Sequence, residues 1–395
     1  MNKRILIISQ VIPQWYVDLL SSVFDSDDII DIITGSKVKG NVISSPKHDS
    51  TSLKSRLISW FKHYRFMMKW IRRNKHIKYD LIFAVSNPPI NPYIGLKLKR
   101  VYNAPFVYMN WDLYPQVIRS SIKNPISSIC CKLWSSWNSR NFHKIDKIIT
   151  IGDVMASSLN EDIKNKVDVS VIPIGVDTQV LKPIDKSLNK FCVENDLVNK
   201  FVVLYSGKMG IGHNIELILE AAKKLEHNSN IIFVFIGFGP KYKTVEDYIS
   251  ANSSINVRLY PLQDEEMFPF SMACGDIGIV TQESSMAHLF MPSKVYSMMA
   301  CGEAIVGLCT DHDDLNTLVK SDCVGLTVTS NSAEELVDVI TKLSDDNVTL
   351  NSYKKQSRKT AVEKYELSII KSKYIQLFDN VFDTSRSSKF ANTVH

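Results

Sequence analysis

The chain has 395 residues, of which 45% are hydrophobic and 22% are charged, and its formal net charge is +6. This length suits two domains of ordinary size, and the composition excludes a disordered or collagen-like protein. Seven cysteines without a Cys-x-x-Cys spacing favour a reducing cytosol over a disulfide scaffold, and no run of about 20 apolar residues predicts a membrane-spanning helix.

Short apolar runs alternate with helix-like stretches along the whole sequence. The first run is too short for a signal peptide and predicts a buried strand. Near-continuous apolar runs are typical of parallel strands that are covered on both faces. We therefore expect an α/β fold with two Rossmann-like, doubly wound halves. The predicted strands are residues 4–9, 81–86, 106–108 and 147–151 in the first half, and 201–206, 231–237, 257–260 and 277–281 in the second.

The segment 51–78 combines many Lys and Arg residues with aromatic side chains and contains no Asp or Glu. Helical spacing places Trp60, Tyr64, Met67 and Ile71 on one side. A basic, aromatic amphipathic helix fits the anionic inner leaflet of a membrane. The alternative is that this side packs into the core and the cations are merely solvated. Nucleic acid is disfavoured as a partner, because no recognised binding module accompanies the charge.

Polar residues follow two predicted strands of the first half. Asn87 follows the strand 81–86, and Asn110, Trp111 and Asp112 follow the strand 106–108. Ligands of open parallel sheets bind at the carboxyl ends of the strands. Asp112 could there orient or deprotonate an acceptor hydroxyl, although an isolated Asp at a strand end is more often a helix cap.

A break in the apolar pattern, between about 178 and 200, predicts the boundary between the two halves. We assign residues 1–180 to the first domain and 181–365 to the second. The stretch 352–382 has strong helical spacing. We assign residues 366–385 to a C-terminal helix and 386–395 to a frayed tail.

A Gly-rich turn follows the strand 201–206 and contains Gly207, Lys208 and Gly210. Glycines let the backbone approach a phosphate closely, a following helix N-terminus favours negative charge, and Lys208 adds a full positive charge. A plain tight turn explains the glycines equally well. The spacing differs from the dinucleotide-binding fingerprint.

The next two strands of the second half also end in candidate binding residues. Gly237 and Gly239 follow the apolar run 231–236, and Leu262 follows the strand 257–260. Backbone groups at these positions could border a nucleobase. They could equally be ordinary turns.

The segment 291–302 carries Pro292, Ser293 and Lys294 after the strand 277–281. Pro292 suits the first turn of a helix, which would place Ser293 and Lys294 beside its free N–H groups. Backbone donors, a hydroxyl and an ammonium group can hold a diphosphate. The plainer interpretation is an amphipathic helix with Tyr296 in the core, and both can be true.

Lys208 and Lys294 together could stabilise a departing diphosphate, as transfer of a sugar from a nucleotide requires. No metal or other cofactor is then needed, and the nine histidines show no metal-ligand spacing.

In their order and spacing, these motifs resemble the retaining glycosyltransferases of family four, which have the two-domain GT-B fold. The likeness is strongest to the bacterial transferases of O-antigen and capsule synthesis, including N-acetyl-fucosamine transferases. The motifs that carry it are Ser86-Asn-Pro-Pro89, Asp112-Leu-Tyr-Pro115, Ile172-Pro-Ile-Gly-Val-Asp177, Tyr205-Ser-Gly-Lys-Met-Gly210 with His213-Asn214, Gly237-Phe-Gly239, and Pro292-Ser-Lys294 through Ala300-Cys-Gly302.

The resemblance implies that a nucleotide sugar, by likeness a UDP-sugar, binds to the second domain, and that a lipid-linked or glycan acceptor binds to the first. It also implies retention without a metal, and a last helix that crosses back to the first domain. Relatives carry two glutamates at the positions of Leu289 and Ser297. Ser297 and Tyr296 are therefore candidates for nucleoside and sugar contacts, with Glu283 as a substitute for the missing carboxylate.

The leading hypothesis is a cytoplasmic glycosyltransferase that is peripheral at the inner membrane. A nucleotide-sugar epimerase would need an acid–base pair around the sugar, and no convincing pair is present. A catalytically inactive membrane scaffold would fit the missing glutamates. A Rossmann oxidoreductase lacks its fingerprint.

Overall fold

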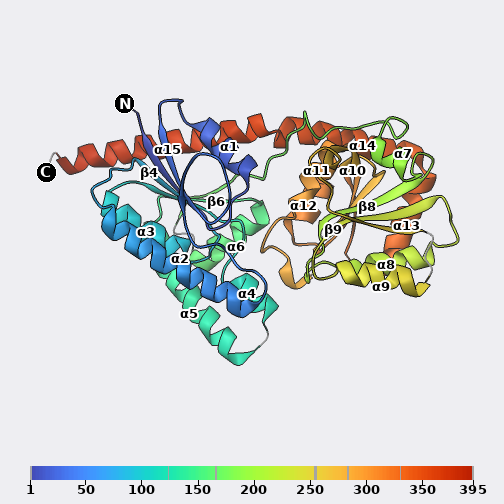
Figure 1. Cartoon of the computed structure of the whole chain (residues 1–395), viewed down its shortest axis with the longest axis horizontal. Helices are drawn as coiled ribbons and strands as arrows, with labels where there is room; N and C mark the ends of the chain where they lie inside the picture. The colour runs from blue at the N-terminus through green and yellow to red at the C-terminus, as the bar shows by residue number, and fades with distance from the viewer. Residues whose placement is uncertain are drawn as a thin grey trace. The chain divides into compact units, whose positions relative to one another are not determined.

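A computed structural model of the chain describes residues 2–122, 124–164, 167–252, 256–282, 284–329 and 331–393. The chain divides into two compact units (Figure 1). The first comprises Met1–Pro173 and Ile370–His395, and the second comprises Ile174–Ile369. The sequence prediction had placed these divisions after residues 180 and 365.

The first unit contains a seven-stranded parallel sheet with the strand order β3-β2-β1-β4-β5-β6-β7. Its strands are β1 Arg4–Ile8, β2 Ile29–Thr34, β3 Asn41–Ser44, β4 Leu81–Val85, β5 Phe106–Met109, β6 Lys147–Thr150 and β7 Val169–Val171. Strand β2 was not among the predicted strands, and it carries the buried carboxylate of Asp31. That carboxylate accepts hydrogen bonds from Arg4 Nε at 2.8 Å and from the Tyr79 hydroxyl at 2.6 Å, which makes its burial tolerable.

Helices cover both faces of this sheet, and the last helix of the chain is one of them. The hydroxyl groups of Tyr16 and Tyr374 are hydrogen-bonded at 2.8 Å, and the Phe378 ring packs on Phe24 and Phe83. The helices of this unit are α1 Gln14–Val23, α2 Leu53–Arg73, α3 Asn91–Tyr102, α4 Gln116–Ser121, α5 Pro125–Asn141, α6 Asp153–Ile163 and α15 Leu367–Thr393.

The prediction of a tail at 386–395 is wrong for the part that the structure describes, because α15 continues to Thr393. Residues 384–393 contain neither Gly nor Pro, so no residue in this stretch forces the helix to end.

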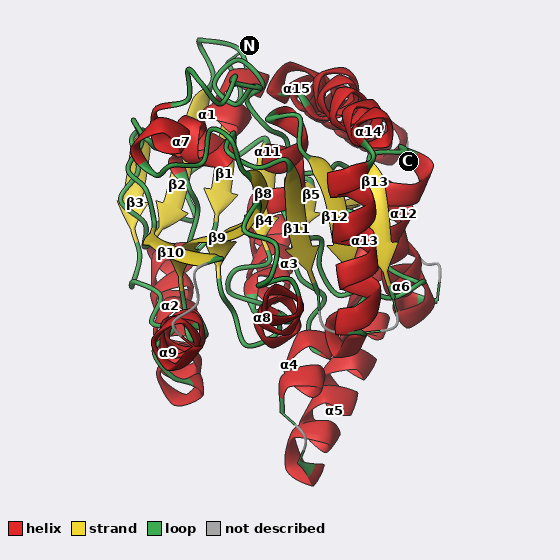
Figure 2. Cartoon of the chain, turned by 90° about the vertical axis from the view of Figure 1, so that its right-hand side faces the viewer, coloured by secondary structure: helices red, strands yellow, loops and turns green. Residues whose placement is uncertain are grey.

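The second unit contains a six-stranded parallel sheet with the order β10-β9-β8-β11-β12-β13. Figure 2 shows the strands in yellow among red helices. The strands are β8 Phe201–Lys208, β9 Ile231–Phe238, β10 Val257–Pro261, β11 Ile277–Thr281, β12 Ala304–Leu308 and β13 Gly325–Val328. The helices are α7 Lys190–Glu194, α8 Ile215–Lys224, α9 Tyr242–Asn252, α10 Phe268–Met272, α11 Lys294–Ala300, α12 Asp314–Ser321, α13 Ala333–Asp345 and α14 Asn347–Thr360.

The helix predicted over 352–382 is interrupted in the structure. Helix α14 is followed by a π-helical turn, Ala361–Tyr365, and by Glu366 in an extended conformation. Glu366 forms a β-bridge with Val176, and its carboxylate accepts a hydrogen bond from the Thr178 N–H at 2.9 Å. The two segments that leave the second unit therefore lie side by side within it.

Candidate functional site

The strand order of each sheet reverses direction at one place, and both places carry predicted site residues. In the first unit this switch point lies between β1 and β4, and in the second it lies between β8 and β11. Ligands of doubly wound sheets bind outside the carboxyl ends of the strands at such points. Asn87 follows β4, Lys208 ends β8, and Lys294 lies beyond β11.

Glycines at the carboxyl ends of β8 and β9 are required by close backbone packing. Gly207 has a φ of +107°, and a Cβ atom on Gly237 would lie 1.9 Å from the Gly207 carbonyl oxygen. A Cβ on Gly239 would lie 2.6 Å from the Met209 carbonyl oxygen. Gly237 and Gly239 thus let the two turns pack against each other, and their contact with a nucleoside stays a prediction.

The amine of Lys294 is buried beside this Gly-rich turn. Its Nζ lies 3.7 Å from the centre of the Tyr205 ring, and a Cβ on Gly207 would lie 3.7 Å from the same nitrogen. Nζ has no hydrogen-bond partner among the described residues. Burial lowers the pKa of this amine to about 7. The Tyr205 ring face attracts the ammonium form but does not replace the hydrogen bonds that water would give.

His213 shows that several amines surround this turn. Its Nδ1 lies 2.6 Å from the Tyr205 hydroxyl, which also donates a hydrogen bond to the Lys208 carbonyl at 2.8 Å. Burial, together with the positive charges of Lys294, Lys208 and Lys241, lowers the pKa of His213 to about 4. The imidazole is therefore neutral at pH 7 within an electropositive region. Sequence analysis named His213 only as part of a motif, because its position between these amines depends on the fold.

The remaining predicted residues of the second unit differ in their accessibility. Ser293 is exposed immediately before the seven-residue helix α11, and its side chain does not cap the helix. Pro292 therefore precedes the helix and is not in its first turn. Gly210 lies against the His213 ring, Ser297 is half-buried on α11, and Leu262 is exposed after β10.

For two other residues that were predicted to contact the nucleoside or sugar, the structure gives no such contact. Tyr296 is 2% exposed, and its ring packs 4.7 Å from that of Tyr365, so the structure assigns this side chain to the core and not to a nucleoside contact. The helical periodicity of α11 directs it inward. Glu283 lies outside the described residues.

In the first unit, three residues that follow β1, β4 and β5 leave buried side-chain atoms unpaired, and we call these residues the polar cluster. Asn87 Oδ1, Trp111 Nε1 and Gln10 Oε1 lack hydrogen-bond partners among the described residues. The Gln10 N–H donates to the Asn87 carbonyl at 2.7 Å, which holds the ends of β1 and β4 together. Sequence analysis missed Gln10, although it stands two residues after β1. Unpaired buried polar atoms are costly and suit a polar ligand.

Asn110 and Asp112 lie next to this cluster. Asn110 is buried, and its Oδ1 accepts a hydrogen bond from the Tyr108 hydroxyl at 3.3 Å, which gives it a structural role. Asp112 is half-buried. Burial raises the pKa of Tyr114, and the negative charge of Asp112 raises it further. Asp112 therefore lies near Tyr114 and next to Trp111 in sequence, and its contact with an acceptor stays a prediction.

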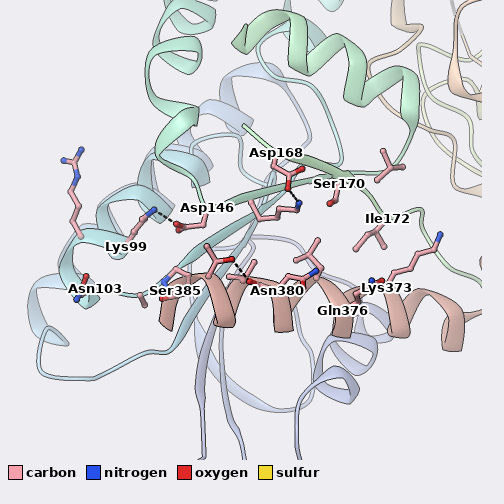
Figure 3. A pocket seen from close by; sticks show the side chains of 18 residues that line it. Lys99, Asn103, Asp146, Asp168, Ser170, Ile172, Lys373, Gln376, Asn380 and Ser385 are labelled. Atoms are coloured by element: carbon pink, nitrogen blue, oxygen red, sulfur yellow. Dashed lines mark hydrogen bonds and ion pairs between the residues drawn. The ribbon is translucent and has the colours of Figure 1, made fainter. Parts of the chain in front are cut away.

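A separate groove of about 1170 Å³ lies at the other end of the first sheet (Figure 3). It is bounded by Lys373, Gln376 and Asn380 of α15 and by residues at the amino ends of the strands, such as Lys147. Four of its charged side chains form ion pairs with one another, Lys99 with Asp146 at 2.7 Å and Lys147 with Asp168. It is thus a different site from the polar cluster.

The side of α2 that was predicted to face a membrane faces the interior of the first unit instead. Trp60, Met67 and Ile71 are buried in the first unit, and Tyr64 is half-buried, so this side packs into the core. The apolar side chains that α2 exposes are Leu53, Leu57, Ile58 and Phe61. No helix among the described residues is long and apolar enough to cross a membrane.

Residues 193–360 match the family model of the glycosyl transferases group 1. This match lies within the second unit. The Gly-rich turn and Lys294 lie within this match. WbjE of Pseudomonas aeruginosa, named as a probable glycosyltransferase, is 22% identical over 304 residues, which are 76% of this chain and 74% of WbjE.

Another relative, WcaI of Escherichia coli K12, has a name that assigns it to colanic acid biosynthesis. It is 25% identical over 209 residues, so the alignment spans 52% of this chain and only 51% of WcaI. Among solved structures, Anabaena HepE in complex with UDP superposes with a TM-score of 0.71 at 13% identity, over 96% of this chain and all of that one. This likeness shows that the two parallel-sheet units form the GT-B fold.

Proposed function

We propose that this protein transfers a sugar from a UDP-sugar to a lipid-linked or glycan acceptor in the synthesis of a surface polysaccharide. The observation that carries the proposal is the buried, unpaired amine of Lys294 beside the Gly207 turn. A buried amine with a lowered pKa is a costly feature, and a bound anion would compensate it. The match to glycosyl transferases group 1 over the same residues supports a nucleotide sugar as the source of that anion.

In this proposal the donor diphosphate is held by the amines of Lys208 and Lys294 and by the Ser293 hydroxyl. Negative charge grows on the diphosphate as its bond to the sugar breaks. Cations that are already in place stabilise that charge more in the transition state than in the ground state. The UDP complex of HepE favours uridine as the base.

We further propose that transfer proceeds with retention and without a metal. The bond from the anomeric carbon to the diphosphate oxygen breaks, and the acceptor oxygen forms its bond on the same face. The acceptor proton passes to the departing diphosphate, so no protein nucleophile is needed. Asp112 orients the acceptor hydroxyl, and the unpaired groups of Gln10, Asn87 and Trp111 bind its polar substituents.

We also propose an acceptor from polysaccharide synthesis and a location at a membrane surface. The name of WcaI favours a polysaccharide pathway. The acid-free basic segment 51–78 favours an anionic lipid surface. The protein would then work at the cytoplasmic face of the inner membrane.

The test is a panel of UDP-, GDP- and other nucleotide sugars, scored for binding by calorimetry and for slow hydrolysis. We expect UDP-sugars to bind and Lys294→Ala to weaken binding and to reduce turnover at least a hundredfold. Lys243→Ala is the control, because that lysine is an exposed residue of α9 outside the site. Equal turnover in Lys294→Ala would refute the role of the amine, and absence of binding by every donor would refute the function. Conversion of a donor without any acceptor would indicate an epimerase.

A further inference from the structure

Helix α5 exposes an apolar stripe to solvent. Of its residues only Cys131 and Asn138 are buried. Ile126, Ile129 and Leu133 are exposed to 76%, 60% and 68%, and their spacing places them on one side of the helix. Figures 1 and 2 both show α5 at the periphery of the first unit. Such a stripe is unusual on a surface that faces only water.

The segment of the sequence that carries this stripe has charges of a single sign. Residues 113–145 contain no Asp or Glu, but they contain Arg119, Lys132, Arg140 and Lys144. Lys132 and Arg140 are exposed residues of α5 itself. This segment is a second acid-free, basic segment of the first unit, besides 51–78.

Aromatic contacts bring the two acid-free segments together. The Tyr114 ring stacks on Trp134 of α5 at 6.3 Å between ring centres and meets Trp60 of α2 edge-on at 6.1 Å. The exposed apolar residues of α2 lie in its N-terminal half, next to Trp60 in sequence. The apolar residues of the α2–α5 surface are Leu53, Leu57, Ile58, Phe61, Ile126, Ile129 and Leu133.

We propose that the α2–α5 surface binds an anionic lipid bilayer. Its apolar side chains enter the boundary between headgroups and acyl chains, and the surrounding Lys and Arg residues pair with lipid phosphates. A second copy of the chain is a poorer occupant, because a two-fold interface would place equal cationic surfaces against each other. The proposal rests on the proposed function, in which the acceptor can be lipid-linked, but vesicle binding itself is measured without any sugar.

The experiment is co-sedimentation of the full chain with vesicles of phosphatidylcholine alone or with 30% phosphatidylglycerol. We expect binding to the anionic vesicles, and at least a tenfold weaker partition coefficient for the triple variant Ile126→Ser, Ile129→Ser, Leu133→Ser. The control is Leu188→Ser with Val348→Ser, two residues of the second unit exposed to 75% and 83%. The double variant Lys132→Gln, Arg140→Gln should weaken binding to the anionic vesicles only.

Equal vesicle binding by the wild type and the triple variant would overturn the proposal. The proposal would also be overturned if the wild type bound no vesicles and formed a dimer that is absent in the triple variant. Hydrolysis of a UDP-sugar in vesicle-free buffer separates the two proposals. If the triple variant keeps donor hydrolysis but loses vesicle binding, both proposals are supported. If the wild type binds vesicles but hydrolyses no donor, the membrane-binding proposal is supported and the proposed function is refuted.

Discussion

The lowered pKa of Lys294 predicts how both stability and donor affinity depend on pH. The ordinary pKa of 10.5 falls to about 7 because the amine is buried. Each tenfold change in a protonation constant is worth 1.36 kcal/mol, so keeping this amine charged in the free protein costs up to about 5 kcal/mol. The side chain is partly exposed and can relax toward water. We therefore expect about 2–4 kcal/mol in practice.

The sign follows from the protons that each state binds. Between pH 7 and 10.5 the unfolded chain keeps a proton that the folded protein has released, so the contribution of Lys294 to stability improves as pH rises through this window. Below pH 7 the amine is protonated in both the folded and the unfolded protein, so the full free-energy cost of burying the ammonium group remains. Lys294→Met should therefore raise the free energy of unfolding at pH 6 by about 2–4 kcal/mol, and this gain should vanish toward pH 10. Urea unfolding at both pH values measures it.

Binding of UDP should reverse the effect, because a diphosphate beside Nζ favours the ammonium form. At pH 8.5 the wild type should take up nearly one proton per UDP bound, whereas Lys294→Met should take up none from this site. Titration calorimetry in two buffers of different ionisation enthalpy measures this uptake. The wild-type Kd should rise by up to tenfold for each pH unit above 7. Identical proton uptake in the wild type and Lys294→Met would refute the reasoning, and Lys243→Met serves as the unchanged control.

Three other substitutions test close packing, a buried charge and a hydrogen-bonded guanidinium group in the second unit. Gly237→Ala places a Cβ 1.9 Å from the Gly207 carbonyl and should cost about 3 kcal/mol or more in urea unfolding; a loss below about 1 kcal/mol would contradict that close packing. Burial raises the pKa of Glu303 well above its usual range, so the wild type should lose stability as pH rises above about 4.5, and Glu303→Gln should flatten the melting temperature between pH 5 and 8. The Arg358 guanidinium donates to the carbonyls of Thr178, Leu181 and Ala300, so Arg358→Lys should destabilise by about 2 kcal/mol, and an unchanged melting temperature would argue against this.

Local pattern was sufficient to place most candidate residues on the correct kind of element. Gly207, Asn87 and Asp112 each stand just after a buried apolar run, and the structure places Gly207 at the carboxyl end of β8 and the other two within three residues of the ends of β4 and β5. This works because a run of apolar residues followed by Gly, Pro or a polar group signals both the strand and its end. Strand β2 was harder to predict, since Asp31 interrupts its apolar pattern and is tolerated only through Arg4 and Tyr79.

Properties that depend on which element covers which face could not be predicted. Helical spacing correctly grouped Trp60, Met67 and Ile71, but it gave no information on whether that face meets the protein core or a lipid surface. The burial of the Lys294 amine also depends on tertiary structure, because the residues beside it, Tyr205 and Gly207, belong to a strand almost ninety residues earlier. The same holds for Gln10, whose importance depends on the pairing of β1 with β4.

The two switch points differ in charge, and this difference gives the assignment of ligands its physical basis. Around the turn after β8, amines of Lys208, Lys241 and Lys294 act on one imidazole, so the site is preorganised for an anion. Around the ends of β1 and β4, the unpaired groups are neutral amide oxygens and an indole N–H, which suit hydroxyl-rich molecules and give a diphosphate no countercharge. This contrast supports our proposal that a nucleotide sugar, whose phosphates need cations, binds to the second unit, and that a glycan, which needs neutral donors and acceptors, binds to the first. Exchanging the two ligands would leave the buried amine uncompensated and the diphosphate unpaired.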